Sequence, residues 1–314
     1  MALVMVSCGE SREEAARRDF EEIISRNKAV GLAVVAVKDG QVVYDQTFGY
    51  RDLESQEPWE GDDVLRIASI SKSFTATGIL QLVEQGKLSL DADVSDIMGF
   101  TIRNPHFPDK PITVQMLLSH TSSMSDANGY FSFDYLHREK SPTWEKAWKK
   151  YEPGTGYQYC NLGFNTLGAI IEKVSGVRFD KYISTNILEP LGVYANHNVH
   201  ALDSSRFVKI YTYSRRDSSF RWTRSAYDLA PEALEDYTLG YSTTLFSPTG
   251  GLKISASDLA KVMLMHMNYG TLDGVKILEK SSSELMQSAL TDNSLQQKRG
   301  QQNFLCRINT YSRY

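Results

Sequence analysis

The chain has 314 residues, which is enough for one large domain or two interlocked domains with a substantial core. Its hydrophobic share of 41% and charged share of 23% are those of an ordinary globular protein. A formal net charge of −4 and the lack of a basic stripe argue against a nucleic-acid partner. We therefore expect a small-molecule or peptide substrate, and the composition leaves the oligomeric state open.

The spacing of the cysteines and histidines predicts no metal site. The three cysteines form neither a disulfide framework nor a metal-spaced set, and none of the 6 histidines belongs to an H-E-x-x-H pattern. The G-x-S-x-G, G-x-G-x-x-G and Walker A motifs do not occur. No apolar run approaches the ~18 residues that span a bilayer. The sequence therefore predicts neither a metal nor an organic cofactor.

The first segment, residues 1–10, is apolar and contains Cys8 near its end. It resembles the end of a lipoprotein signal, in which a cysteine becomes the lipidated N-terminus. The alternative is an unmodified start that carries a free thiol. The resemblance predicts an exported, periplasmic or membrane-anchored lipoprotein with a lipid anchor at Cys8, whereas the alternative predicts a cytoplasmic protein.

A helix and a hairpin are predicted next. Ser11 and Glu14 have the spacing of a capping box, and the apolar residues after them fall on one helical face. Residues 31–50 read as a hairpin with β-branched strands and a turn at Asp39 and Gly40. Because the first strand is apolar throughout, we expect both faces of its sheet to be covered.

The stretch Ser69-Ile70-Ser71-Lys72 opens an apolar helix that ends near Gly86. Residues three apart share a helical face, so the Lys72 amine can reach the Ser69 hydroxyl. Backbone N–H groups and the dipole at a helix N-terminus favour a developing anion. A serine becomes a useful nucleophile when such a base lies beside it. The alternative is that Ser69 only caps the helix and Lys72 is a solvated first-turn residue.

The same S-x-x-K pattern occurs a second time, from Ser25 to Lys28. This match lies at the polar end of the first predicted helix, and no apolar run follows it. We interpret it as a solvated pair without a catalytic role.

The middle of the chain, from about residue 87 to 240, reads mostly as helices and long loops. Residues 112–124 predict a helix that runs into a turn, and residues 161–176 predict an amphipathic helix. Residues 250–270 predict a short apolar approach, a cap at Ser257 and a further helix. A sheet-forming start followed by a helical body predicts an α+β fold with two lobes.

Five segments, in the same order, resemble those of the serine β-lactamase-related family, which includes class C β-lactamases, D-alanyl-D-alanine peptidases and related esterases. These segments are LRIASISKSFTATGILQLVEQGKLSLDADV, ITVQMLLSHTS, EPGTGYQYCNLGFNTLGAIIEKVSG, NILEPLGV and GGLKISASDLAKVML. The resemblance extends from about residue 30 to 290. It implies a β-lactamase/transpeptidase-like α+β fold, in which an antiparallel sheet flanked by helices lies beside an all-helical lobe.

The resemblance also implies a division of the chain. The sheet lobe would comprise residues 11–65 and 241–290, and the mainly helical lobe residues 66–240. The ending, residues 291–314, resembles no part of the family and shows little strand pattern. The family's third motif, a triplet ending in glycine on a strand beside the nucleophile, does not occur. We expect a sheet incomplete at its C-terminal side, in a chain shortened relative to its relatives; the alternative is a branch with a divergent ending.

The catalytic roles follow from the same resemblance. It implies that Ser69 is an acylated nucleophile, that Lys72 and Tyr159 handle its proton, and that Asn161 binds the lysine or the substrate. Which of Lys72 and Tyr159 takes the first proton stays open, and the Ser69 N–H is a candidate oxyanion donor. A second Y-x-N, at residues 194–196, follows a segment that is not catalytic in the relatives, so no role is assigned to it.

Two hypotheses for the function remain at this point. The first is a serine acyl hydrolase that acts on a β-lactam, a D-alanyl peptide or a small ester. The second is a catalytically impaired family member, either a binding protein or a truncated remnant, because the third motif is absent. A smaller departure is Ser123, which stands where the family usually has glycine after His-Thr-Ser, and we interpret His120 as structural.

Overall fold

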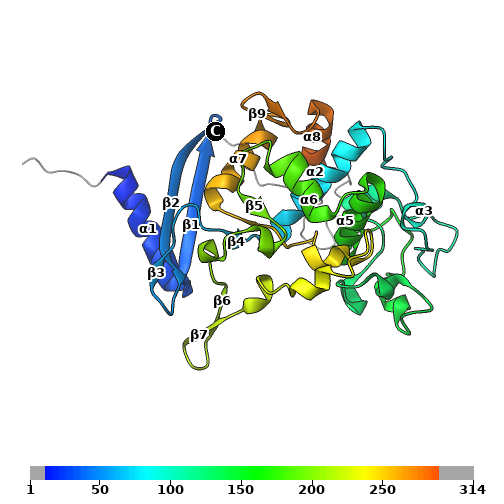
Figure 1. The fold of residues 1–314 in the computed structure, drawn as a ribbon, viewed down its shortest axis with the longest axis horizontal. Helices are drawn as coiled ribbons and strands as arrows, with labels where there is room; N and C mark the ends of the chain where they lie inside the picture. The colour runs from blue at the N-terminus through cyan, green and yellow to red at the C-terminus, as the bar shows by residue number, and fades with distance from the viewer. Residues whose placement is uncertain (1–10, 290–314) are drawn as a thin grey trace, which may run out of the picture.

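The computed structural model describes residues 11–289 (Figure 1). The candidate lipid anchor at Cys8 and the ending at residues 291–314 lie outside this range, so the statements made about them stay predictions. Among the described helices, none is long and apolar enough to cross a membrane.

The first helix, α1 (Arg12–Asn27), begins with the predicted capping box. The Ser11 hydroxyl accepts a hydrogen bond from the Glu14 N–H at 3.2 Å, and the Glu14 carboxylate accepts one from the Ser11 N–H at 2.8 Å. The apolar face of the helix brings Phe20 to the following hairpin, where its ring centroid lies 5.6 Å from that of Phe48. This contact places α1 against the sheet.

The predicted hairpin consists of β1 (Gly31–Lys38) and β2 (Gln41–Asp52), which pair antiparallel. The turn residues Asp39 and Gly40 both have positive φ angles, as a tight two-residue turn of this kind requires. A short strand, β3 (Glu57–Pro58), pairs with β2 and completes a three-stranded sheet in the order β1-β2-β3.

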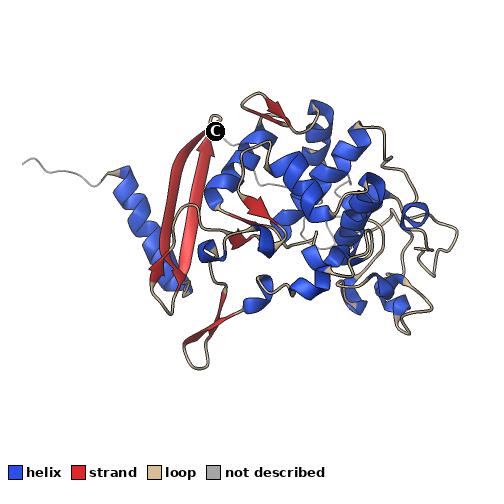
Figure 2. Cartoon of the chain, viewed as in Figure 1, coloured by secondary structure: helices blue, strands red, loops and turns tan. Residues whose placement is uncertain are grey.

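Two helices cover the two faces of this sheet, as Figures 1 and 2 show: α1 on one face and α7 (Ala256–Met267) on the other. The prediction of a covered sheet is thus confirmed, although the residues of β1 are half-buried or exposed rather than fully buried. The predicted cap at Ser257 is wrong. The Ser255 hydroxyl accepts from the Asp258 N–H at 3.1 Å, because Ser255 lies three residues before that donor while Ser257 is already helical.

A second small sheet lies deeper in the molecule. It has the order β4-β8-β5 and joins three short antiparallel strands: β4 (Leu65–Arg66), β8 (Lys253–Ile254) and β5 (Ala195–Asn196). A cavity of about 520 Å³ is lined both by β1 residues such as Leu32 and by β4 and β8 residues such as Leu65 and Ile254. The two sheets are therefore separated by open space along part of their length.

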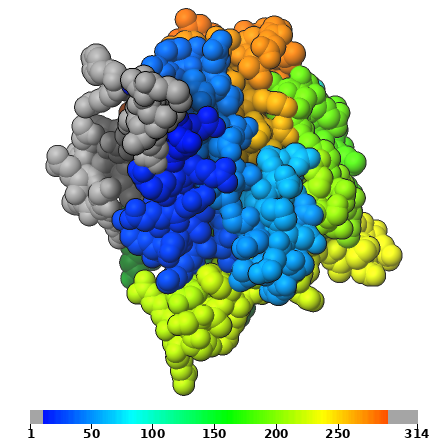
Figure 3. Space-filling model, turned by 90° about the vertical axis from the view of Figure 1, so that its left-hand side faces the viewer, coloured from blue at the N-terminus to red at the C-terminus, as the bar shows by residue number. Residues whose placement is uncertain are grey.

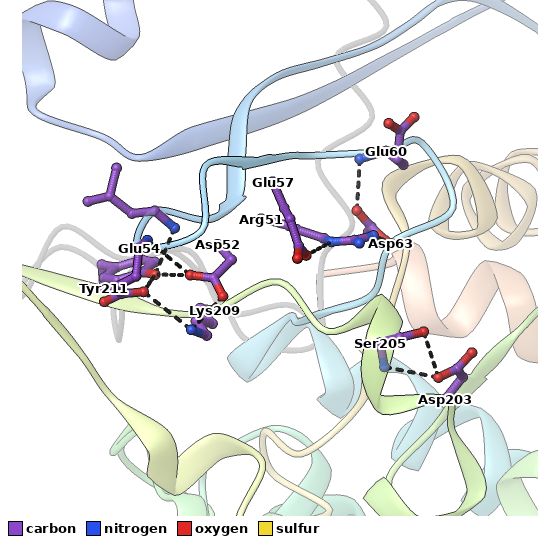
Figure 4. Close-up of polar contacts among 11 residues, drawn as sticks. Arg51, Asp52, Glu54, Glu57, Glu60, Asp63, Asp203, Ser205, Lys209 and Tyr211 are labelled. Atoms are coloured by element: carbon purple, nitrogen blue, oxygen red, sulfur yellow. Dashed lines mark hydrogen bonds and ion pairs between the residues drawn. The ribbon is translucent and has the colours of Figure 1, made fainter.

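Two further hairpins complete the strands of the described residues. Figure 3 shows the first of them, at residues 211–222, projecting from one end of the molecule. Its base is held by polar contacts between Lys209 or Tyr211 and the end of β2, with Lys209 Nζ 2.6 Å from an oxygen of Asp52 (Figure 4). The strands are β6 (Tyr211–Ser214) with β7 (Ser219–Trp222), and β9 (Thr271–Leu272) with β10 (Val275–Lys276).

The helical body is built around one central helix, α2 (Ser71–Glu84), which packs against α5 (Asn161–Ser175), α6 (Phe179–Ile183) and α8 (Lys280–Gln287). Nearly all of α2 is buried, including its polar residues, because other helices surround it. The predicted helix at residues 161–176 is α5, and it ends before Gly176, whose φ angle is 72°. Two short helices, α3 (Val94–Met98) and α4 (Val114–Leu118), also belong to this body.

A buried carboxylate attaches later parts of the chain to α5. Glu172 is only 1% exposed and accepts hydrogen bonds from four groups. These donors are the Phe179 N–H, the Tyr237 hydroxyl, the Gly240 N–H and the Thr243 hydroxyl. The network orders the segment that leads to Thr249, which lies beside the candidate site. The whole arrangement, antiparallel sheets flanked by helices beside a helical body, is the predicted α+β architecture.

Candidate active site

Ser69 lies on a single turn of 3₁₀ helix, η1 (Ala68–Ile70), directly before α2. The turn is strained, because Ala68 has a φ angle of 48°, which is uncommon for a residue other than glycine. Ser71 holds it in place: its hydroxyl donates to the Ala68 carbonyl at 2.7 Å and accepts from the Leu252 N–H at 3.1 Å. The start of α2 is therefore attached to the chain that leads into β8.

Lys72 is 2% exposed, and its amine meets three oxygen atoms from three parts of the chain. The distances from Lys72 Nζ are 3.3 Å to Ser69 Oγ, 2.9 Å to Asn161 Oδ1 and 2.8 Å to the Thr249 carbonyl oxygen. A protonated lysine has three N–H donors and no acceptor. The arrangement of acceptors therefore fits the charged form of this side chain.

Tyr159 approaches Ser69 from the other side. Its hydroxyl lies 2.8 Å from Ser69 Oγ, and its ring centroid lies 4.8 Å from Lys72 Nζ. The structure thus brings together all four site residues named from the sequence, Ser69, Lys72, Tyr159 and Asn161. Ser69 itself is exposed, so the hydroxyl is open to an incoming molecule.

The duplicate sequence patterns lie elsewhere. Ser25 and Lys28 are exposed at the end of α1. The Tyr194 hydroxyl accepts a hydrogen bond from the Asp203 N–H at 2.7 Å, and Asn196 is buried in β5. These placements agree with the assignment of the site to Ser69 and Tyr159.

His120 supports the site without facing the solvent. Its Nδ1 accepts a hydrogen bond from the Cys160 N–H at 3.2 Å, and its ring packs against those of Tyr159 and Phe164, with centroids at 4.5 and 5.0 Å. Burial, together with the positive charge of Lys72, lowers the pKa of His120 to about 3. The imidazole is therefore neutral at ordinary pH and positions the chain that carries Tyr159.

The serine at position 123 has a structural explanation. Its φ angle is 61°, in the left-handed region where glycine is favoured. The Ser123 hydroxyl accepts a hydrogen bond from Nδ2 of the buried Asn104 at 2.8 Å. The turn thus keeps the backbone conformation that glycine allows, and the added hydroxyl has a partner.

Two residues beside the site were missed by the sequence patterns. The Thr249 hydroxyl donates to Asn161 Oδ1 at 2.7 Å, and the Asp126 carboxylate accepts from Asn161 Nδ2 at 2.8 Å. The Thr-Gly pair at residue 249 was visible in the sequence only as part of the approach to a later helix. No local signal marked Asp126.

Within residues 11–289, no group of three metal-ligating side chains is gathered in one place.

Comparison with known proteins identifies the family. Residues 16–305 match the model of the Beta-lactamase family. Over 238 residues the chain is 29% identical to Penicillin-binding protein 4* of Bacillus subtilis, covering 73% of this chain and 46% of that protein. Over 202 residues it is 33% identical to a lovastatin esterase of Penicillium rubens, covering 55% of this chain and 50% of that protein.

A solved structure has the same fold. The octameric penicillin-binding protein homologue from Pyrococcus abyssi matches with a TM-score of 0.70 and 28% identity, over 89% of this chain and 60% of that one. The chain spans about half the length of the curated relatives named above. Because the family model covers most of the chain and the fold agrees, the protein belongs to the serine β-lactamase-related family.

Proposed function

We propose that this protein is a serine acyl hydrolase that forms an acyl-enzyme through Ser69. The observation that carries the proposal is the position of the Ser69 hydroxyl, 2.8 Å from the Tyr159 oxygen and 3.3 Å from the Lys72 nitrogen. A nucleophile within hydrogen-bond reach of its proton acceptor is the arrangement that acyl transfer needs. The membership of the chain in a family of serine hydrolases supports the reaction class.

Lys72 and Tyr159 take different parts in the proposed reaction. The three oxygen atoms around Lys72 Nζ favour the ammonium form, which cannot accept a proton. The Lys72 ammonium lies 4.8 Å from the centroid of the Tyr159 ring, where its positive charge can stabilise negative charge that develops on the tyrosine oxygen during proton transfer. The Tyr159 oxygen is therefore the proposed acceptor of the Ser69 proton, and Lys72 supplies the charge that allows it.

The proposed reaction transfers the acyl group in two stages, first to Ser69 and then to water. Ser69 Oγ attacks the substrate carbonyl carbon while its proton moves to the Tyr159 oxygen. Tyr159 returns this proton to the leaving nitrogen or oxygen as the old acyl bond breaks. A water molecule repeats the attack on the acyl-enzyme and releases the acid and free Ser69. The Ser69 N–H is a candidate oxyanion donor, and loss of such a donor typically costs about 10²–10³ in rate.

For the substrate we propose a β-lactam, a D-alanyl peptide or a small ester. One relative is named as a penicillin-binding protein and another as an esterase, which supports the β-lactam and the ester, whereas the D-alanyl peptide rests on the family resemblance. The exposure of Ser69 leaves room for acyl groups of different shapes. None of these substrates requires a metal or an organic cofactor.

A second candidate function is binding without efficient turnover. The sequence contains no triplet of the third family motif, and Ser69 is exposed to water. Oxyanion donors stabilise a transition state most strongly in a water-excluded site. A protein that binds these substrates but acylates slowly would fit both observations.

Covalent labelling separates the two functions. Wild-type protein is incubated with a fluorescent penicillin and, separately, with a fluorophosphonate probe, and the labelled band is quantified over time. We expect labelling that is lost in Ser69→Ala. Labelling should be slowed at least about a hundredfold in Lys72→Ala, because Tyr159 then lacks the charge that supports it as the proton acceptor, and loss of general-base catalysis typically costs about 10²–10⁴ in rate. Ser25→Ala, which alters the other S-x-x-K, is the matched control and should label normally. Folded wild-type protein that takes up neither probe would support the binding function instead.

A further inference from the structure

Asp126 lies on a short 3₁₀ helix, η2 (Asp126–Asn128), and its carboxylate meets the start of α5. One oxygen accepts from the N–H of Asn161 at 2.9 Å and from Asn161 Nδ2 at 2.8 Å. The other accepts from the Leu162 N–H at 3.0 Å and from the Cys160 thiol at 3.3 Å. The carboxylate thus replaces the cap that α5 lacks, because Cys160, at the N-cap position, makes no side-chain cap bond.

The same carboxylate determines which way the Asn161 amide points. An amide side chain has an oxygen and an NH₂ group of similar shape, so its orientation depends on its hydrogen-bond partners. An ionised Asp126 can only accept, so it attracts the NH₂ group. On the opposite side, Lys72 Nζ and the Thr249 hydroxyl both donate to the amide oxygen, at 2.9 and 2.7 Å.

If the Asn161 amide were turned by 180°, it would make unfavourable contacts on both sides. Its NH₂ group would face the Lys72 ammonium, and its oxygen would face the Asp126 carboxylate. Neither contact could form a hydrogen bond, and both would bring like charges or partial charges together. The two sides of Asn161 therefore act together to hold one orientation.

We propose that Asp126 is a positioning residue for acylation: it acts through Asn161 to keep an amide oxygen on the Lys72 ammonium. The inference rests on the proposed function and adds to it a residue that does not touch the reacting atoms. Asp126 keeps Lys72 charged and in place, and Lys72 in turn supports Tyr159 as the proton acceptor.

The alternative is that Asp126 only caps α5, and two substitutions at this position separate the roles. Asp126→Ala removes both oxygens, so the Asn161 amide is free to turn. Asp126→Asn can keep one oxygen beside Asn161 Nδ2 and turn its own NH₂ group toward the Cys160 sulfur. The asparagine variant therefore preserves the orientation of Asn161 while it weakens the cap and removes the charge.

The experiment is a double-mutant cycle on the acylation rate constant with the fluorescent penicillin. We expect Asp126→Ala to acylate about 10- to 100-fold more slowly, the scale of one hydrogen bond to a charged group. Asp126→Asn should remain within a few-fold of wild type. In an Asn161→Ala background, Asp126→Ala should change the rate less than about twofold, because the group through which it acts is gone. Equal losses in both backgrounds, or an asparagine variant as slow as the alanine variant, would overturn the proposal.

Asp93→Asn is the matched control, because Asp93 also caps a helix: its carboxylate accepts from the Ser95 N–H at 2.9 Å at the start of α3. Its carboxylate pairs with Arg103 and Ser95 rather than with Asn161. We expect this variant to lose stability in a urea titration and to acylate at the wild-type rate.

A second readout does not depend on turnover. Proteins with ¹³C-labelled lysine are titrated by NMR, and the Lys72 Cε signal, assigned with Lys72→Arg, reports the pKa of the amine. The neighbouring titratable groups, Tyr159 and His120, are the same in all variants. Asp126→Ala should lower the Lys72 pKa when Asn161 is present and leave it nearly unchanged in Asn161→Ala. An equal drop in both backgrounds would mean that Asp126 acts by its charge alone and would overturn the proposal, even if wild type were never acylated.

Discussion

Lys253 permits a quantitative test of how burial affects a charge in this fold. It lies on β8, is 5% exposed, and donates to the His197 carbonyl at 3.1 Å. Burial, with the positive charge of Arg66, lowers its pKa from the ordinary 10.5 to about 8. At about 1.4 kcal/mol per pH unit, keeping this amine charged in the folded protein costs about 3 kcal/mol.

The direction in which stability changes with pH depends on the pH at which Lys253 loses its proton in the folded and in the unfolded chain. The unfolded chain keeps the Lys253 proton up to about pH 10.5, whereas the folded chain releases it near pH 8. Between these values the unfolded state binds more protons, so stability rises with pH. Below pH 8 both states are charged, and the full cost is present and constant.

The assay compares wild type with Lys253→Met, which keeps an unbranched apolar side chain and removes the amine. Urea unfolding is followed by tryptophan fluorescence at several pH values from 7 to 9.5. The free energy of unfolding of wild type minus that of the variant should rise by about 2 kcal/mol over this range. Groups that titrate alike in both proteins cancel in the difference.

Lys87→Met is the control, because Lys87 is exposed on the loop after α2. Its difference from wild type should stay flat over the same pH range. A flat difference for Lys253→Met as well would refute the reasoning, because it would mean that the buried amine keeps its proton as readily as a solvated one.

Two further predictions concern buried titratable groups. Glu172→Ala leaves four hydrogen-bond donors without their acceptor and should reduce the free energy of unfolding by about 3–5 kcal/mol. Glu172→Gln should reduce it by less. A loss below about 1 kcal/mol in the alanine variant would contradict this prediction. Burial lowers the pKa of His120 and His197 to about 3 and that of His266 to about 4. Below about pH 6.5 the unfolded state therefore binds more protons, and stability should fall as the pH drops toward 4. His266→Leu should reduce this slope by up to about 1.4 kcal/mol per pH unit in urea titrations at pH 4–7; an unchanged slope would count against the burial argument.

Local elements were predictable because their signals come from residues close together in the chain. The capping box of α1 and the turn at Asp39 and Gly40 depend on neighbours within about four positions. The start of α7 was placed two residues too late, because Ser255 and Ser257 both suit a cap and only the geometry distinguishes them. Ambiguities of this kind are common at helix boundaries.

The proximity of Ser69 and Lys72 also follows from local spacing, since residues three apart share a helical face. Tyr159 and Asn161 could be named only through the resemblance of their segment to the family motif. Nothing in the spacing of the chain indicates that the Tyr159 hydroxyl lies 2.8 Å from Ser69 Oγ across 90 residues.

Local patterns in the chain therefore account for α1, the β1–β2 hairpin, α2 and α5, for the S-x-x-K pair and for the family resemblance, but not for the short strands β4, β5 and β8. Long-range packing sets which atoms surround the amine of Lys72. The Thr249 carbonyl comes from 177 residues away, and Asp126 reaches Asn161 across 35 residues. The physical reason is that a hydrogen bond depends on the distance and direction between two groups, and packing of α2, α5 and the chain before β8 sets both.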